Sequence, residues 1–192
     1  ACGMVPLADG SDMGGSLCNP ASFCNVVGLR PAPGRVPKWS QTSAWSTLGV
    51  DGPMGRSVAD VAFFLSVIAG PDPRSPIAIA APGRRFADAL DRDVTGVRVA
   101  WATRLGGIPF DPELRRVVEA QRATFDSLGC SVEDAEPDFA GADEAFKVLR
   151  AWLFEAQYAD LVRTSRSQIK ATVIGEVERG AKLTGPQLSR AE

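Results

Sequence analysis

Histidine is absent from this sequence of 192 residues, and its absence excludes several catalytic mechanisms at once. A Ser-His-Asp triad, a Cys-His pair, an HExxH zinc site and a zinc finger all require an imidazole. Any chemistry carried by these residues therefore needs another proton-transfer group. The four cysteines show no CxxC spacing, so we expect reduced thiols, as is usual in the cytoplasm.

The sequence also lacks an excess of one charge and any long apolar run. Lys and Arg number 21 and Asp and Glu number 23, which leaves no basic surface for nucleic acid or an anionic membrane. The longest apolar runs, such as residues 61–69, are far shorter than the roughly 20 residues of a membrane helix. We therefore expect a cytoplasmic protein with no nucleic-acid, membrane, metal or cofactor partner.

Local signals predict an α/β architecture. Strands are expected at 4–8, 26–30, 97–102 and 130–133, and helices at 20–24, 58–69, 112–128, 142–163 and 171–179. Asn19 and Pro20 are expected to open the first helix, and Ser57 to Asp60 fits a capping box for the second. That second helix has little polar surface, so it is expected to be buried.

The segments between these elements are expected to be irregular. Residues 37–54 carry two tryptophans and several Gly and Pro residues, which favours an ordered loop, and the prolines of residues 71–95 indicate a linker. Trp39 and Trp45 in the loop either line a channel for an acyl group or serve only in packing. The strand, helix and strand over 97–133 predict a parallel sheet with a right-handed crossover.

Gly14, Gly15 and Ser16 form the best candidate site on physical grounds. A strand that leads into a glycine loop and then into a helix exposes successive backbone N–H groups, which can hold a developing oxyanion. A serine at the end of such a loop is placed to attack the same carbonyl carbon. The tripeptide alone favours a simpler interpretation, a glycine-rich turn in which the serine only caps a helix.

A longer segment around this tripeptide closely resembles the amidase signature family. Residues 10–31 read GSDMGGSLCNPASFCNVVGLRP, and residues 52–60 and 69–74 are similar to the segments that follow the signature in that family. The resemblance implies a partial amidase signature fold of the α/β class, with a mixed sheet flanked by helices. It also implies a Ser–cis-Ser–Lys hydrolase that acts on a small-molecule carboxamide, with a homodimer as one possible assembly of the full-length protein.

The resemblance assigns roles to individual residues. Ser16 matches the nucleophile that forms the acyl-enzyme, and the backbone N–H groups of Met13, Gly14 and Gly15 match the oxyanion hole. Ser11 and Asp12 match the positions that support the loop. The serine proton would pass through a second serine to a neutral lysine. Burial must lower the pKa of that lysine well below its usual value of about 10.4.

The sequence departs from the family pattern in two respects. The catalytic Lys and the bridging cis-Ser lie upstream of the nucleophile in the family, whereas the first lysine here is Lys38. We therefore expect residues 1–192 to be the central part of a single amidase signature domain, without its N-terminal and C-terminal parts and inactive alone. Within it, 1–36 form the signature, 37–95 the loop, buried helix and linker, and 96–192 the remaining elements.

The second departure is Cys18, which stands where the family commonly has Arg. Losing that charge is expected to loosen the loop or alter substrate preference, and the thiol itself is expected to be either reactive or partly buried.

Two other functions stay open: the A subunit of a tRNA-dependent amidotransferase, which needs partner subunits and tRNA, and a non-catalytic remnant that acts by binding. Ser167 to Lys170 also matches the SxxK pattern of serine acylases, but no companion motif follows it.

Overall fold

The computed structural model describes residues 2–39, 42–88 and 90–192. Their internal contacts divide them into two compact units. The first unit combines residues 1–90 with 149–185, and the second combines 91–148 with 186–192. The predicted division of a single family domain at 36/37 and 95/96 stays a prediction.

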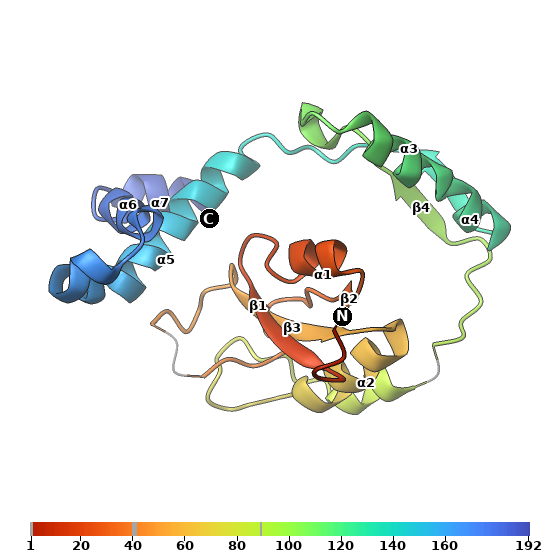
Figure 1. Ribbon diagram of the computed structural model, residues 1–192, viewed down its shortest axis with the longest axis horizontal. Coiled ribbons are helices and arrows are strands. Elements are labelled where there is room, and N and C mark those ends of the chain that lie inside the picture. The colour runs from red at the N-terminus through yellow and green to blue at the C-terminus, as the bar shows by residue number, and fades with distance from the viewer. Residues whose placement is uncertain (1, 40–41, 89) are drawn as a thin grey trace. The chain divides into compact units, whose positions relative to one another are not determined.

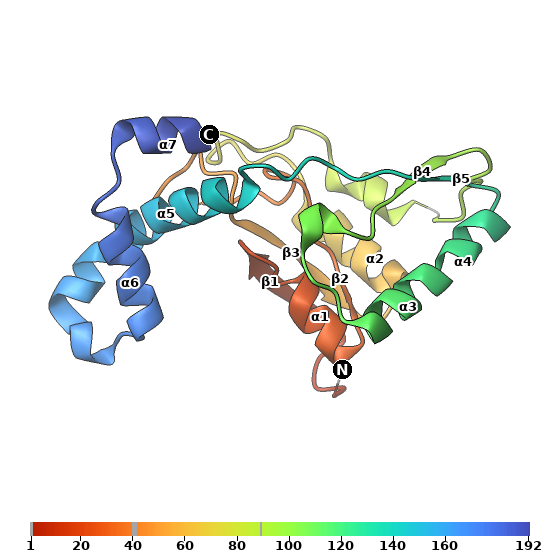
Figure 2. The ribbon, with the colours of Figure 1, turned by 90° about the horizontal axis from the view of Figure 1, so that it is seen from above.

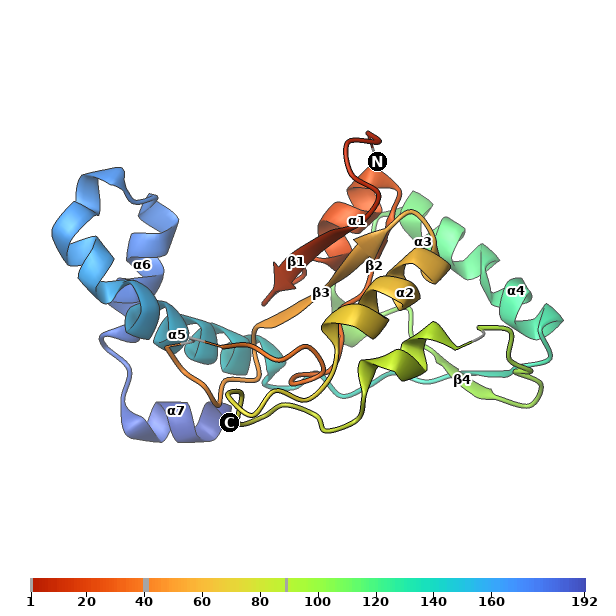
Figure 3. The ribbon, with the colours of Figure 1, turned by 90° about the horizontal axis from the view of Figure 1, so that it is seen from below.

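A three-stranded antiparallel sheet forms the centre of the first unit (Figure 1). Strand β3 (Val50–Gly55) lies between β1 (Ala8–Asp12) and β2 (Val27–Gly28). Helices α1 (Cys18–Cys24) and α2 (Val58–Ile68) cover opposite faces of this sheet, as Figures 1 and 3 show from two directions. The loop from β1 to α1 therefore emerges at the end of the β1 strand, next to the start of β3.

Glycines allow α1 to lie close to the sheet. Gly10 of β1 stands opposite Gly52 of β3, and the fully buried Leu17 side chain packs against both. A Cβ at Gly52 would lie 2.8 Å from Leu17 Cδ1, and a Cβ at Gly28 would lie 2.7 Å from the Leu17 carbonyl oxygen. Because these contacts leave no room for a side chain, the glycines set the position of Leu17 and of Ser16 before it.

Strand β3 differs from the sequence-based expectation of a loop over residues 37–54. That prediction is wrong for residues 50–54. Gly52 and Pro53 are both uncommon in strand interiors, so local preference argues against the strand. It forms because it has a neighbour on each side, and the Pro53 carbonyl still accepts a hydrogen bond from Leu29 N–H at 3.1 Å. The first strand likewise begins at Ala8 rather than over residues 4–8.

The N-caps predicted for the two helices that cover this sheet have different outcomes. The capping box of α2 is confirmed, since the Ser57 and Asp60 side chains each accept a hydrogen bond from the other's backbone N–H at 3.1 Å. The expected cap of α1 is wrong, because Leu17 rather than Asn19 holds that position. The burial of α2 is also only partial: Val61 and Leu65 are buried, whereas Val58, Phe63 and Val67 are exposed.

Helical segments complete the first unit (Figure 3). The helices expected over 142–163 and 171–179 are confirmed as α5 (Ala142–Ser165) and α6 (Ala171–Gly180), with a short 3-10 turn at Arg166–Gln168 between them. The end of α6 meets α5 closely, because a Cβ at Gly180 would lie 2.2 Å from the carbonyl oxygen of the fully buried Ala151. Helix α7 (Gly185–Ala191) follows, and all but its first residue belongs to the second unit. The described residues also contain the 3-10 turns η1 (Gly83–Ala87) and η2 (Leu105–Gly107).

The second unit contains the predicted parallel pair of strands (Figure 2). Strands β4 (Arg98–Trp101) and β5 (Ser131–Asp134) are parallel, and α3 (Pro112–Ala120) and α4 (Arg122–Ser127) connect them. The single helix expected over 112–128 is interrupted at Gln121. The α/β class is thus confirmed, with the antiparallel and parallel pairings of the described strands in two separate sheets.

Candidate active site

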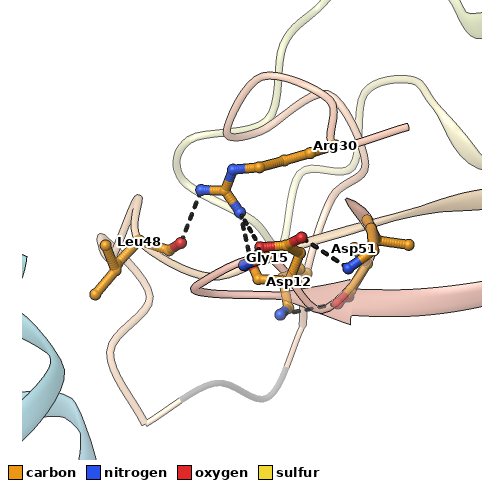
Figure 4. Close-up of polar contacts among 7 residues, drawn as sticks. Asp12, Gly15, Arg30, Leu48 and Asp51 are labelled. Carbon is orange, nitrogen blue, oxygen red and sulfur yellow. Dashed lines mark hydrogen bonds and ion pairs between the residues drawn. The ribbon is translucent and has the colours of Figure 1, made fainter. Parts of the chain in front are cut away.

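Asp12 organises the loop between β1 and α1, although its side chain is only 1% exposed. One carboxylate oxygen, Oδ1, accepts a hydrogen bond from Gly15 N–H at 2.8 Å, and Oδ2 accepts one from Leu17 N–H at 2.7 Å. The two bonds close residues 12–17 into a turn that leads directly into α1 (Figure 4). A buried carboxylate without such donors would be strongly unfavourable, so the turn and the burial of Asp12 depend on each other.

Arg30 joins this turn to the segment before β3. Its Nη1 atom donates to the Asp12 carbonyl oxygen at 2.6 Å and lies 3.2 Å from Asp12 Oδ1. Its Nη2 atom donates to the Leu48 carbonyl oxygen at 3.0 Å (Figure 4). The guanidinium therefore uses its planar donor geometry to hold two chain segments and one carboxylate together.

These contacts also determine the charge state of Asp12. Burial by itself raises the pKa of the carboxyl group, but hydrogen bonds from the Leu17 and Gly15 N–H groups and the charge of Arg30 outweigh it. The pKa of Asp12 is therefore lowered from its ordinary value of 3.8. At neutral pH the loop is built around a carboxylate anion.

Gly15 and Ser16 stand at the end of this turn. Gly15 has a φ of +107°, a backbone conformation that favours glycine. The Ser16 side chain is exposed and makes no hydrogen bond to any residue in the described ranges. Its hydroxyl is thus accessible to a reagent in solution.

The three backbone N–H groups expected to form an oxyanion hole are not equivalent. The Gly15 N–H donates to Asp12, so it is already engaged. The N–H groups of Met13 and Gly14 have no hydrogen-bond partner within residues 2–39, 42–88 and 90–192. An exposed hydroxyl beside two uncommitted N–H donors can attack a carbonyl carbon while its oxygen gains negative charge near those donors.

Comparison with known proteins identifies the family of this chain. The family model for amidases matches residues 1–189. The chain belongs to the amidase signature family. An amidase signature enzyme of known structure, a bacterial aryl acylamidase, superposes with a TM-score of 0.85 at 26% identity, over 97% of this chain and 41% of its own.

Two relatives with different activities are similar to this chain in sequence. An acylamidase from Rhodococcus erythropolis is 34% identical over 196 residues, which cover all of this chain and 41% of that protein. The A subunit of glutamyl-tRNA(Gln) amidotransferase from Synechococcus sp. strain CC9605 is 42% identical over 141 residues, or 72% of this chain and 29% of that protein. The chain therefore spans about two fifths, at most, of these relatives.

The remaining predicted site residues have distinct surroundings. Ser11 is exposed on β1, and its partner in the strand register is Asp51 of β3. Cys18 is exposed, so the expectation of a partly buried thiol is wrong. Although position 18 carries no arginine, the loop has a cation next to Asp12, which is the guanidinium of Arg30. Sequence reasoning missed this role, since Arg30 and Asp12 are 18 positions apart and no local pattern links them.

The structure also bears on disulfides, metal sites and membrane helices. Cys2, Cys18, Cys24 and Cys130 are free thiols. Residues 2–39, 42–88 and 90–192 contain no group of three or more His, Cys, Asp or Glu side chains arranged to hold a metal ion. None of the helices described there combines the length and apolar character that a membrane span requires.

Proposed function

We propose that Ser16 is the nucleophile of an amide hydrolase. The observation that carries this proposal is the turn held by Asp12, which leaves an exposed hydroxyl next to the free N–H groups of Met13 and Gly14. Membership of the amidase signature family supports it, as does the match of an acylamidase to the whole chain.

The proposed reaction has two steps. Ser16 Oγ attacks the amide carbon and forms an ester bond, the C–N bond breaks, and the amine leaves with a proton. Water then hydrolyses the ester and restores the serine. During both attacks the carbonyl oxygen carries negative charge, and we assign its stabilisation to the Met13 and Gly14 N–H groups.

The mechanism also needs a proton acceptor for the Ser16 hydroxyl. The family pattern places a lysine and a bridging serine upstream of the nucleophile. The first lysine in this sequence, Lys38, follows Ser16 and pairs with Asp51, with Nζ 3.0 Å from Oδ1. We therefore propose that these 192 residues alone form no acyl-enzyme and that hydrolysis needs a longer polypeptide with both groups.

Labelling with a fluorophosphonate, which reacts with activated serines, tests the nucleophile. We expect labelling of a polypeptide that contains these residues together with the family's upstream segments, and loss of labelling in its Ser16→Ala variant. Ser22→Ala, which changes an exposed serine of α1, is the matched control and should label normally. Equal labelling of the Ser16→Ala variant would overturn the assignment, and labelling of the 192-residue chain would overturn the upstream location of the base.

A second candidate function is the A subunit of an amidotransferase, favoured by the 42% identity to such a protein. The acylamidase match extends over the whole chain and ranks the simple hydrolase first. The two are separated by assaying a small amide without any partner protein. Turnover by the isolated protein supports the hydrolase, and turnover only after partner proteins are added supports the amidotransferase.

A further inference from the structure

A cavity of about 320 Å³ lies in the first unit, next to the loop that carries Ser16. Met13, Trp39 and Leu153 form its apolar walls. We call it the Trp39 cavity. Its volume is at the lower end of the range for small-molecule sites, about 300–1,000 Å³. Trp39 is 63% exposed and Trp45, the other tryptophan of the same segment, is 73% exposed, but only Trp39 belongs to the lining.

Covalent structure and hydrogen bonds connect the cavity to the proposed nucleophile. Met13 lines the cavity with its side chain, and it also carries one of the N–H groups proposed to hold the carbonyl oxygen. Gly49, which also belongs to the lining, follows Leu48, whose carbonyl oxygen accepts a hydrogen bond from Arg30. Because Arg30 also holds Asp12, one side chain fixes both the cavity wall and the loop. Met13 therefore belongs both to the cavity lining and to the loop that carries Ser16.

The charges around the cavity cancel. Lys38 is the charged side chain of its lining, and its Nζ lies 3.0 Å from Asp51 Oδ1, with both side chains no more than 34% exposed. A ligand with a carboxylate would have to compete with Asp51 for this ammonium group. The electrostatics thus favour an uncharged ligand.

Uncommitted polar groups complete the lining. The hydroxyl groups of Thr42, Ser43 and Ser46 and the amide of Gln157 make no hydrogen bond to another residue that the structure describes. These groups can each donate and accept a hydrogen bond. Apolar walls with a few convergent polar groups are typical of sites that orient a neutral organic molecule.

Trp39 itself is held in place from outside the cavity. The guanidinium of Arg74 lies 5.5 Å from the centre of the indole ring, within the range of a cation–π contact. Asp72 fixes Arg74 in turn, with Oδ2 at 2.7 Å from Nη2. A large aromatic surface that is oriented before binding loses little conformational freedom when a ligand contacts it.

We propose that the Trp39 cavity binds the acyl group of an uncharged amide, with an aromatic or branched apolar group against Trp39. This inference rests on the proposed function, because it makes the cavity the acyl-binding part of the Ser16 site. It assigns substrate selection to Trp39 and to the neutrality of the Lys38–Asp51 pair.

The first experiment measures kcat/KM for benzamide and for acetamide in the longer polypeptide that carries the proposed base. We expect Trp39→Ala to lower kcat/KM for benzamide about tenfold, since an aromatic contact contributes on the order of one factor of ten. Acetamide is too small to reach the ring, so its kcat/KM should hardly change. Trp45→Ala is the matched control and should leave both values unchanged. An equal loss for both amides in Trp39→Ala would contradict the proposal.

The second experiment compares benzamide with 4-carboxybenzamide. In the native protein benzamide should be preferred. Asp51→Asn removes the partner of Lys38, so the relative kcat/KM for 4-carboxybenzamide should rise severalfold. A variant that is merely destabilised would lose activity toward both amides alike. An unchanged ratio of the two would show that the charge balance does not select the substrate.

Binding without turnover separates this inference from the proposed function. Titration calorimetry with benzamide on the Ser16→Ala protein should show binding that Trp39→Ala weakens about tenfold. If that dependence is found but Ser16 is not the nucleophile, the cavity binds a neutral aromatic amide, but the hydrolase assignment fails and so does the acyl-binding role of the cavity. If Ser16 labels as expected but Trp39→Ala leaves benzamide binding and turnover unchanged, the cavity proposal alone fails.

Discussion

Asp12 shows how one side chain organises a site that is otherwise made of backbone. Residues 13–16 (Met, Gly, Gly and Ser) carry no charged side chain. The carboxylate of Asp12 holds Gly15 and Leu17 through their N–H groups, and Arg30 neutralises its charge. A carboxylate is needed because it accepts hydrogen bonds with both oxygens at once.

Replacing Asp12 by Asn therefore should destabilise the protein in a pH-dependent manner. The amide keeps one acceptor oxygen and loses the charge, so we expect a loss of about 2 kcal/mol in the free energy of unfolding at pH 7. The pKa of Asp12 is lower in the folded protein than its ordinary value of 3.8. The ionised Asp12 therefore contributes fully to the free energy of unfolding above pH 3.8, and this contribution disappears as the pH falls through the lower pKa of the folded protein.

Denaturant unfolding of both proteins at pH 7 and at successively lower pH values checks this expectation. The difference between native protein and Asp12→Asn should shrink below pH 3.8. Asp9→Asn, which changes an exposed carboxylate on the same strand, is the control and should have little effect at pH 7. A difference that stays constant down to the lowest pH would refute the role of the ionised carboxylate.

At the scale of elements, close contact between α1 and the sheet positions the loop. Gly28 lies directly against α1, because a Cβ there would meet the Leu17 carbonyl oxygen at 2.7 Å and Ala21 Cβ at 2.9 Å. Neither atom is the end of a flexible side chain, so the helix itself would have to move. The same movement would displace Ser16.

Gly28→Ala should consequently destabilise the protein by about 1–3 kcal/mol, as overpacking usually does. Gly175→Ala is the same chemical change in the middle of α6, where the added Cβ meets nothing within 4 Å. Since alanine favours helix formation by about 1 kcal/mol over glycine, that variant should be slightly more stable. Denaturation midpoints that shift in the same direction for both variants would show that close packing of α1 is not the cause.

At the scale of the whole molecule, much apolar surface is exposed. Phe23 of α1 is 90% exposed, and Phe63 and Val67 of α2 are 60% and 68% exposed. Contiguous exposed apolar surface on soluble proteins usually marks a place where other structure packs. The relatives that match the whole chain are more than twice its length, so their other segments are the structure we expect over such surfaces.

The 192-residue chain by itself should therefore self-associate and bind a hydrophobic dye such as ANS. Sedimentation velocity should show oligomers that become smaller when Phe23 and Phe63 are both replaced by Gln. Ser22→Gln, on the exposed surface of α1, is the control and should not change the association. A native chain that sediments as a monomer without dye binding would contradict this expectation, and the homodimer predicted for the full-length protein needs its own measurement.

Sequence signals were sufficient wherever a structure is decided within a few residues. The capping box of Ser57 and Asp60, the N-cap at Asp111 and the glycine that ends the helical segment at Gly129 all depend on bonds between close neighbours. The signature around Ser16 belongs to the same group, since its glycines and Asp12 interact within six residues. These signals determined the α/β class, the family and the candidate nucleophile.

Tertiary structure decided what depends on distant residues. Strand β3 contains Gly52 and Pro53 and forms only because β1 and β2 pair with it on both sides. Arg30 reaches Asp12 and Leu48 across 18 positions in each direction. The Trp39 cavity includes Leu153, far along the chain from Met13. Hydrogen bonds and packing of this kind depend on how the chain folds back on itself, and no short sequence pattern encodes that distance.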